Sequence, residues 1–95
     1  MFVVLLRFSS NKADAAEYME GHNAWIARGL EDGVFLLVGS LVPKQGGAIV
    51  AHGITLAELE VRVKEDPFVE AAVVEAEILE IAAAKADPRL EFLLG

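Results

Sequence analysis

The fold is decided by residues 34–51, VFLLVGSLVPKQGGAIVA, in which two apolar runs flank a turn. Residues 34–38 and 48–51 are rich in β-branched and aromatic side chains, which favour strands. Between them, residues 43–47 combine a proline with two glycines, the residues that most often interrupt regular structure. The segment therefore predicts a β-hairpin in the middle of the chain.

Helical patterns flank this hairpin on both sides. From about residue 12 to residue 31, apolar residues recur at three- and four-residue spacing, and Gly33 is placed to end the helix. This stripe consists of Ala15, Tyr18, Met19, His22, Trp25, Ile26, Gly29 and Leu30. After the hairpin, Thr55 followed by Glu58 has the form of a capping box, which predicts a second helix that runs to about Glu65.

Strands are predicted outside the two helices. Residues 2–8, FVVLLRF, are apolar on both faces and predict a covered strand. Residues 73–84 mix β-branched residues with alanine and glutamate, so the residues alone leave strand and helix open. With a strand there, the order is β-α-β-β-α-β, the split βαβ pattern of ferredoxin-like α+β folds. We expect one domain over residues 1–95, with residues 83–95 as a docked C-terminal tail.

The composition restricts the class of protein. The net charge is −7, and the 8 basic residues are scattered singly, whereas nucleic-acid binding shows as a basic patch. No apolar run approaches the ~20 residues of a membrane helix, and the opening stretch reads as a strand rather than a signal peptide. The chain has no cysteine, which excludes disulfides and thiolate metal sites and fits a reducing compartment. We therefore expect a cytoplasmic protein that binds neither nucleic acid nor membrane.

The predicted fold leaves one face of the sheet bare. Both helices would cover the same face, although the strands carry apolar residues on both. An open apolar surface of that size marks an interface. A two-fold partner that covers it with its own sheet is the economical solution, so we predict a homodimer through the open sheet face.

Two residues are candidates for chemistry, and each has a structural interpretation as well. His22 lies on the apolar stripe, which fits a packed core histidine, yet a histidine also transfers protons near neutral pH. Asp66 precedes Pro67, the arrangement of a helix N-cap. Asp87-Pro88 repeats this dipeptide in the tail and serves as an internal control. Asp66 differs by position, because the end of the second helix can approach the first helix in a split βαβ fold.

Other residues are candidate ligand contacts with plain structural alternatives. Glycines in the hairpin would let a ligand approach the backbone, or they serve the turn alone. Arg7, the lone charge of the first strand, would contact an anionic ligand or pair with a glutamate. Trp25 would pack in the core or form a wall of the pocket. These candidates are Arg7, Trp25, Gly39, Ser40 and Gly47. His52 is expected to be exposed, and no metal motif, phosphate loop or cofactor site is expected.

Three motifs resemble the YCII-related domain family: residues 21–26 (GHNAWI), residues 36–49 (LLVGSLVPKQGGAI) and residues 65–69 (EDPFV). They occur in the order and spacing of that family, and the resemblance covers about residues 1–82. It implies a ferredoxin-like dimer that forms an α+β barrel, a strand for residues 73–81, and a pocket that holds His22 and Asp66. The family often has proline where this chain has Ser40, which alters that edge of the pocket.

The resemblance turns these residues into a functional hypothesis. The first hypothesis is a cofactor-independent small-molecule enzyme, isomerase- or lyase-like, in which His22 transfers a proton and Asp66 orients and stabilises it. The alternative is a non-catalytic module that binds a small ligand or only dimerises, with a structural histidine. The sequence does not specify the substrate.

Overall fold

Four strands form one antiparallel sheet in the order β2-β3-β1-β4. The structure is a computed structural model and describes residues 1–94. Its elements are β1 (Phe2–Phe8), the 3-10 helix η1 (Lys12–Asp14), α1 (Ala15–Glu31), β2 (Phe35–Leu41), β3 (Gly46–Ala51), α2 (Leu56–Lys64), α3 (Pro67–Glu70), β4 (Val74–Glu80) and the 3-10 helix η2 (Pro88–Leu94). The predicted ferredoxin-like α+β fold is confirmed, and the short helix α3 is an addition to the predicted order.

The hairpin β2-β3 forms where the breakers predicted it. β3 pairs with β2 on one side and with β1 on the other, and Gly46 lies opposite both Leu41 and Arg7. Gly46 has φ +127°, and a Cβ atom at this position would overlap the carbonyl oxygen of Leu6. Glycine is therefore required for β3 to start beside β1.

The helix ends follow the predicted signals. At the end of α1, Gly33 has φ +73°, its N–H donates to the Leu30 carbonyl, and the N–H of Val34 donates to the Gly29 carbonyl. These two bonds are those of a Schellman motif. At the start of α2, the Glu58 N–H donates to Thr55 Oγ1 at 3.1 Å, and the Thr55 N–H donates to Glu58 Oε1 at 3.3 Å. The predicted capping box is confirmed.

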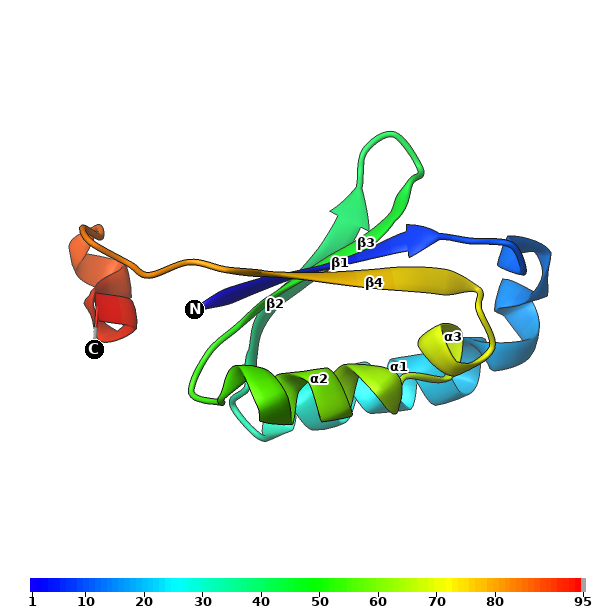
Figure 1. Cartoon of the computed structure of the whole chain (residues 1–95), viewed down its shortest axis with the longest axis horizontal. Coiled ribbons are helices and arrows are strands. Elements are labelled where there is room, and N and C mark those ends of the chain that lie inside the picture. The colour runs from blue at the N-terminus through cyan, green and yellow to red at the C-terminus, as the bar shows by residue number, and fades with distance from the viewer. Residues whose placement is uncertain (95) are drawn as a thin grey trace.

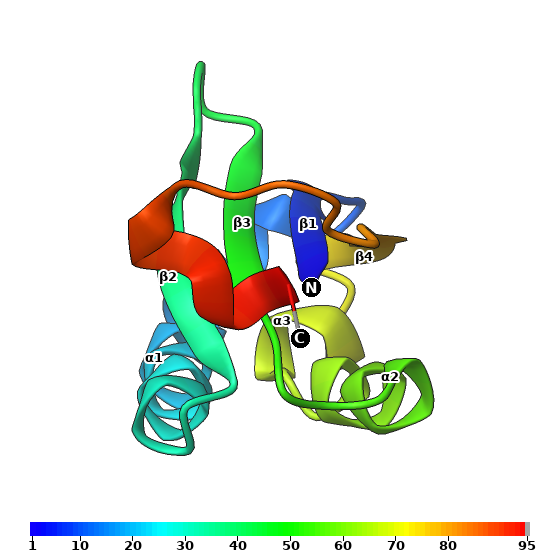
Figure 2. The ribbon, with the colours of Figure 1, turned by 90° about the vertical axis from the view of Figure 1, so that its left-hand side faces the viewer.

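The helices cover only one face of the sheet (Figures 1 and 2). Phe2, Val4 and Leu6 alternate along β1 and are buried beneath α1 and α2. Their core partners are Trp25, Val34, Phe35, Ile49, Ala51, Leu59, Val63, Phe68, Val73 and Val74. Val3 and Leu5 point the other way and are only partly buried, so this face of the sheet is open, as predicted.

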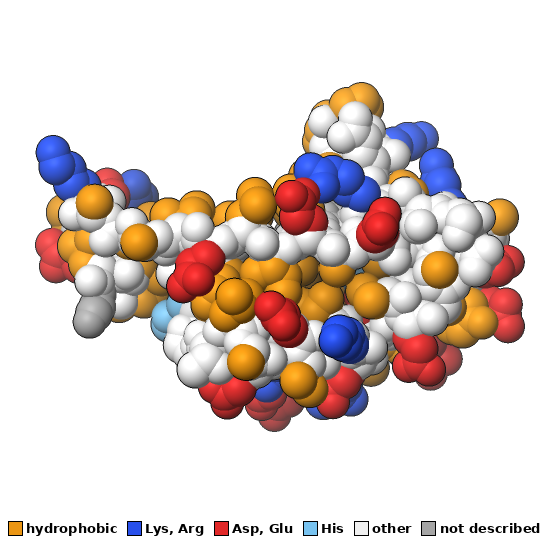
Figure 3. Space-filling model, in the orientation of Figure 1, with side chains coloured by type: hydrophobic (Ala, Val, Ile, Leu, Met, Phe, Trp, Pro, Cys, Tyr) orange, Lys and Arg blue, Asp and Glu red, His pale blue; other side chains and the backbone are white. Residues whose placement is uncertain are grey.

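The segment that the residues left ambiguous is a strand. β4 pairs with β1 along its length, from Phe2 opposite Glu80 to Phe8 opposite Val74. Between this edge strand and α2, apolar side chains line an open groove, visible as orange atoms in the middle of Figure 3. No helix within residues 1–94 has the length and apolar character needed to cross a membrane.

The C-terminal segment leaves the body of the domain after β4 (Figure 1). Leu90, Phe92 and Leu94 of η2 are each about half exposed, at 46%, 53% and 44%. The ring of Phe92 meets that of His52 edge-on, with centroids 5.4 Å apart. The expectation of an exposed His52 was wrong, because this contact leaves the side chain partly buried. Docking of the whole tail stays a prediction, and its last residue, Gly95, lies outside the described residues.

Candidate active site

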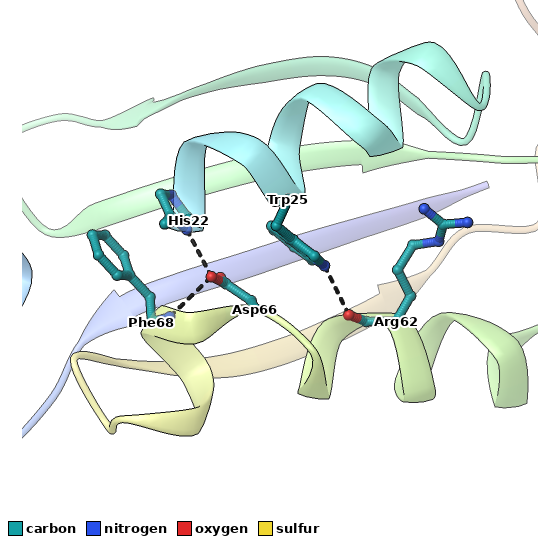
Figure 4. Close-up of polar contacts among 5 residues, drawn as sticks. All are labelled: His22, Trp25, Arg62, Asp66 and Phe68. Atoms are coloured by element: carbon teal, nitrogen blue, oxygen red, sulfur yellow. Dashed lines mark hydrogen bonds and ion pairs between the residues drawn. The ribbon is translucent and has the colours of Figure 1, made fainter. Parts of the chain in front are cut away.

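The fold brings His22 of α1 and Asp66 into direct contact (Figure 4). His22 Nδ1 lies 2.8 Å from Asp66 Oδ1, although the two residues are 44 positions apart in the sequence. α1 reaches Asp66 because the loop between α2 and α3 lies beside it. The side chain of His22 is 12% exposed and that of Asp66 is fully buried.

Asp66 performs the capping role and the pairing role with the same oxygen. Its Oδ1 accepts the backbone N–H of Phe68 at 3.0 Å, the N-cap bond of α3, and it also contacts His22. Its second oxygen, Oδ2, is buried without a hydrogen bond within residues 1–94. Unpaired buried carboxylate oxygens are costly and therefore call for an explanation. Within residues 1–94, the one side chain that hydrogen-bonds to this buried carboxylate is the imidazole of His22.

This contact fixes the protonation pattern of the imidazole. A carboxylate oxygen only accepts hydrogen bonds, so Nδ1 of His22 carries the proton, and this N–H donates a hydrogen bond to Asp66. In the neutral ring, Nε2 is then the unprotonated nitrogen, and it makes no hydrogen bond within the described chain. Nε2 is also not fully buried. The arrangement offers Nε2 as a proton acceptor or, when protonated, as a donor.

Aromatic rings hold the imidazole in place. The ring of Phe68 stacks on that of His22 with a centroid distance of 3.9 Å and an angle of 4°. The ring of Trp25 lies 6.0 Å away on the same helix, and its Nε1–H donates to the carbonyl oxygen of Arg62 at 2.9 Å. This bond ties α1 to α2 just before the chain turns toward Asp66 (Figure 4).

Gly21 permits the close approach of α3 to α1. A Cβ atom at Gly21 would lie 3.0 Å from Cγ of Pro67, closer than nine in ten real Cβ contacts. Gly21 immediately precedes His22, and Pro67 immediately follows Asp66. Gly21 and Pro67 therefore set how closely α1 and α3 approach each other, and with that the distance between His22 and Asp66.

A cavity of ≈ 290 Å³ lies between α1 and the helix-facing side of the sheet, with His22 in its wall. The remaining lining is mostly apolar or glycine: Leu6, Phe8, Met19, Asn23, Ile26, Val38, Gly39, Ser40, Gly46, Gly47, Ala48, Ile49, Phe68 and Val74. Cavities of this kind, apolar with a few polar groups, are typical of small-molecule sites. Asp66 is not in the wall and lies behind the histidine.

The predicted ligand contacts divide into two groups. Gly39, Ser40 and Gly47 line the cavity, together with Gly46. Arg7 lies on the open face of the sheet and forms an ion pair with Glu77 at 2.6 Å. Trp25 is buried in the core, 2% exposed. Neither Arg7 nor Trp25 contributes to the cavity wall that the described residues form.

Asn23 is a polar residue of the wall that sequence reasoning missed. It follows His22 directly in residues 21–26, and this neighbouring position was the sequence signal that could have identified Asn23 as a site residue. As for metal ions, no group of three or more histidine, aspartate or glutamate side chains within residues 1–94 is placed to hold one.

Comparisons with known proteins agree with this fold. The family model of the YCII-related domain matches residues 1–87. No curated protein matches the sequence. Among solved structures, the chain is similar to 5-chloro-2-hydroxyhydroquinone dehydrochlorinase from Burkholderia phenoliruptrix AC1100, solved in complex with 2,5-dihydroxybenzoquinone. The TM-score is 0.69 with 14% identity, over 85% of this chain and 93% of the other, a likeness of fold.

Proposed function

Because the chain belongs to the YCII-related domain family, we propose that it is a small-molecule enzyme in which His22 transfers a proton and Asp66 supports it. The observation that carries the proposal is the 2.8 Å contact between His22 Nδ1 and the buried carboxylate of Asp66, which leaves Nε2 for a ligand. A histidine with only a packing role needs no buried carboxylate behind it, since burying a charge is unfavourable.

In the proposed reaction, Nε2 of neutral His22 takes a proton from a carbon or hydroxyl of the substrate. The imidazolium that forms is stabilised by the adjacent carboxylate of Asp66 and by the stacked ring of Phe68. In an isomerisation, the same proton returns to another atom of the substrate. In an elimination, the electron pair left by the proton forms the new double bond as the leaving group departs with its own pair.

The similar structure is that of a dehydrochlorinase bound to a hydroxylated quinone, and this favours elimination from a ring compound as the reaction to test first. The wall residues Asn23 and Ser40 would bind oxygen substituents of such a ring. Gly39 and Gly47 would let it lie close to the backbone of the hairpin.

Two assays test the proposal on the purified protein. The first measures chloride released from 5-chloro-2-hydroxyhydroquinone, and the second measures deuterium incorporated from D₂O into enolisable cyclic ketones. His22→Gln is expected to lower the rate about 10²- to 10⁴-fold, the usual contribution of a positioned acid–base group. His52→Gln is the matched control and is expected to keep the wild-type rate. A His22→Gln protein that retains its activity would refute the role of His22. A wild-type protein that binds ring compounds without turnover would favour the non-catalytic alternative.

We also propose that the protein is a homodimer through its open sheet face. Val3, Leu5, Leu37, Ala48, Val50 and Leu79 share this face by their register. Leu37 is 60% exposed and Leu79 is 43% exposed, so the patch is accessible to a partner. A two-fold copy would cover it with the same residues.

Light scattering at micromolar concentration tests the dimer. The wild type is expected at the mass of two chains, and the double variant Leu37→Glu/Leu79→Glu at the mass of one. Leu30→Glu changes an equally exposed leucine of α1 and is expected to leave the dimer intact. A wild-type protein of monomer mass contradicts the proposal.

A further inference from the structure

A second, open cavity adjoins the His22 cavity at the end of β1. It has a volume of ≈ 580 Å³ and is lined by Phe8, Lys12, Ser40, Leu41, Val42, Pro43, Lys44 and Gly46. Phe8, Ser40 and Gly46 also line the His22 cavity, so the two spaces are neighbours. We call the second space the vestibule.

Two lysines, Lys12 and Lys44, line the vestibule. Nζ of Lys12 lies 4.8 Å from the centre of the Phe8 ring, which belongs to both cavities. The segment before Lys12 is anchored, because the side chain of Asn11 donates to the Ala71 carbonyl at 2.9 Å. The turn that carries Lys44 is held to β1 by the N–H of Phe8, which donates to the Gln45 carbonyl at 3.1 Å. Figure 3 shows basic side chains beside the hairpin.

The His22 cavity and the vestibule are lined without acidic side chains, although the chain as a whole is acidic. The protein has 15 acidic and 8 basic residues, yet none of the residues that line the two cavities is an aspartate or glutamate. The arginines at positions 7, 62 and 89 are paired with Glu77, Asp32 and Asp87, respectively. Within residues 1–94, Lys12 and Lys44 form no ion pair, so their charges are available to a ligand.

We propose that the site takes a planar ring compound that carries an anionic group, with the ring beside His22 and Phe68 and the anion beside Lys12 and Lys44. This inference rests on the proposed function, because it places the reacting ring against Nε2 of His22. A cavity of ≈ 290 Å³ suits a single substituted ring, and the aromatic side chains of His22 and Phe68 both line it. Lys12 and Lys44 border a cavity whose wall contains no acidic side chain, so they attract an anion and orient it as it enters.

A matched pair of probes separates charge from shape. 2,5-Dihydroxybenzoate and 2,5-dihydroxybenzamide have nearly the same size, but only the benzoate is charged at neutral pH. Titration followed by the NMR signals of the His22 ring gives both dissociation constants at the site. Exposed ion pairs contribute about 0.2–1 kcal/mol each, so two of them are expected to favour the benzoate about 2- to 30-fold. Raising ionic strength from about 0.01 to about 0.15 M, which shortens the Debye length from about 30 to about 8 Å, is expected to weaken benzoate binding alone.

Lysine variants locate the charge effect. Lys12→Gln/Lys44→Gln is expected to abolish the preference for the benzoate, with each single variant intermediate. Lys64→Gln/Lys85→Gln removes the same charge outside both cavities and is expected to keep the preference. Equal affinities of the two probes, or a preference that survives in Lys12→Gln/Lys44→Gln, overturn the inference and leave the proposed function standing. If neither probe perturbs His22 while ring compounds are still turned over, the anionic ligand class is wrong. If turnover is absent as well, both proposals fail.

Discussion

Replacing Asp66 with asparagine separates the charge of the pair from its geometry. Oδ1 of Asp66 accepts two N–H groups, that of Phe68 at 3.0 Å and that of His22 at 2.8 Å. An amide nitrogen in this position would face two donors, so the carbonyl oxygen of the new side chain must take it. The NH₂ group then occupies the place of the unpaired Oδ2. We therefore predict that Asp66→Asn keeps the N-cap and the Nδ1–H tautomer and loses only the negative charge.

The stability of this variant follows from the same geometry. A buried donor without a partner costs about 1–3 kcal/mol, but it replaces a carboxylate oxygen that was itself unpaired and charged. The net loss is expected to be about 1 kcal/mol, or about 4–8 °C in Tm for a domain of this size. Asp66→Ala instead leaves the N–H groups of Phe68 and His22 without an acceptor, and is expected to lose about 2–5 kcal/mol.

Activity is expected to fall more than stability. Hydrogen bonds to charged groups contribute about 1.5–3 kcal/mol, so loss of the charge behind the imidazolium should lower kcat/KM about 10- to 100-fold. The corresponding change in serine proteases costs about 10⁴-fold, because there the asparagine imposes the wrong histidine tautomer. The smaller loss is a consequence of the N-cap bond from Phe68, which prevents the amide from turning.

Nitrogen-15 NMR of the histidine rings reads the tautomer directly, and deuterium exchange into a cyclic ketone reads the activity. Asp87→Asn is the matched control, because it changes the other Asp-Pro dipeptide, in the exposed tail, and should affect neither readout. An Nε2–H tautomer in Asp66→Asn, or a loss of activity near 10⁴-fold, would refute the argument that Phe68 fixes the amide. Unchanged activity would refute the role of the charge.

Four further predictions concern the scaffold and the tail. Gly46→Ala is expected to unfold the hairpin or to lower the free energy of unfolding, measured by chemical denaturation, by more than about 3 kcal/mol. Gly39→Ala is the control: its new methyl group has open space around it, so the free energy of unfolding should change by less than about 1 kcal/mol. Gly29→Ala is expected to displace the buried ring of Phe35 and cost about 2–4 kcal/mol, and an unchanged Tm would contradict this packing. Gly21→Ala is expected to push Pro67 away and weaken the His22–Asp66 hydrogen bond, seen as a shifted His22 Nδ1 resonance, with a Tm loss of less than about 8 °C. The side chain and then the backbone N–H of Arg89 lower the pKa of Asp87 below its ordinary value of 3.8, so this contact is complete at neutral pH and is lost as the pH falls. The Arg89 amide signal should therefore move with a midpoint below pH 3.8 in the wild type and stay fixed in Asp87→Asn.

The parts of the fold that the sequence predicted are those with local causes. The capping box at Thr55 and the glycine end of α1 at Gly33 involve residues within a few positions of each other, and both formed as expected. Residues 73–84 were ambiguous because pairing with β1 decides their conformation, and the partner lies about 70 residues away. Asp66-Pro67 had the form of a helix N-cap, but α3 was absent from the predicted order because it is a single turn, too short to show a period.

For the site, local pattern predicted the candidates, and only the order of the elements and the family resemblance predicted that His22 and Asp66 are neighbours. The pairing of His22 with Asp66 depends on the loop after α2 lying beside α1, a relation that no spacing within either motif contains. Arg7 is the opposite case, a candidate that the structure places away from the cavity. Alternation along β1 places it on the face of Val3 and Leu5, opposite the cavity, and Glu77 from β4 pairs with it. The sequence left two alternatives for Arg7, an anionic ligand or a glutamate, and the ion pair with Glu77 confirms the second. The strand period places Arg7 on the open face and so separates these alternatives.

For Asp66, the structural and functional interpretations describe one arrangement. The N-cap bond to Phe68 holds the carboxylate at the start of α3, and the same bond places the ring of Phe68 where it stacks on His22. Asp87 lacks this combination, because its capping-type bond to Arg89 lies in an exposed tail and its carboxylate forms no hydrogen bond with a histidine within residues 1–94. A capping aspartate therefore becomes part of a candidate active site when α3 packs against the helix that carries the histidine, and the closeness of Gly21 to Pro67 provides that packing.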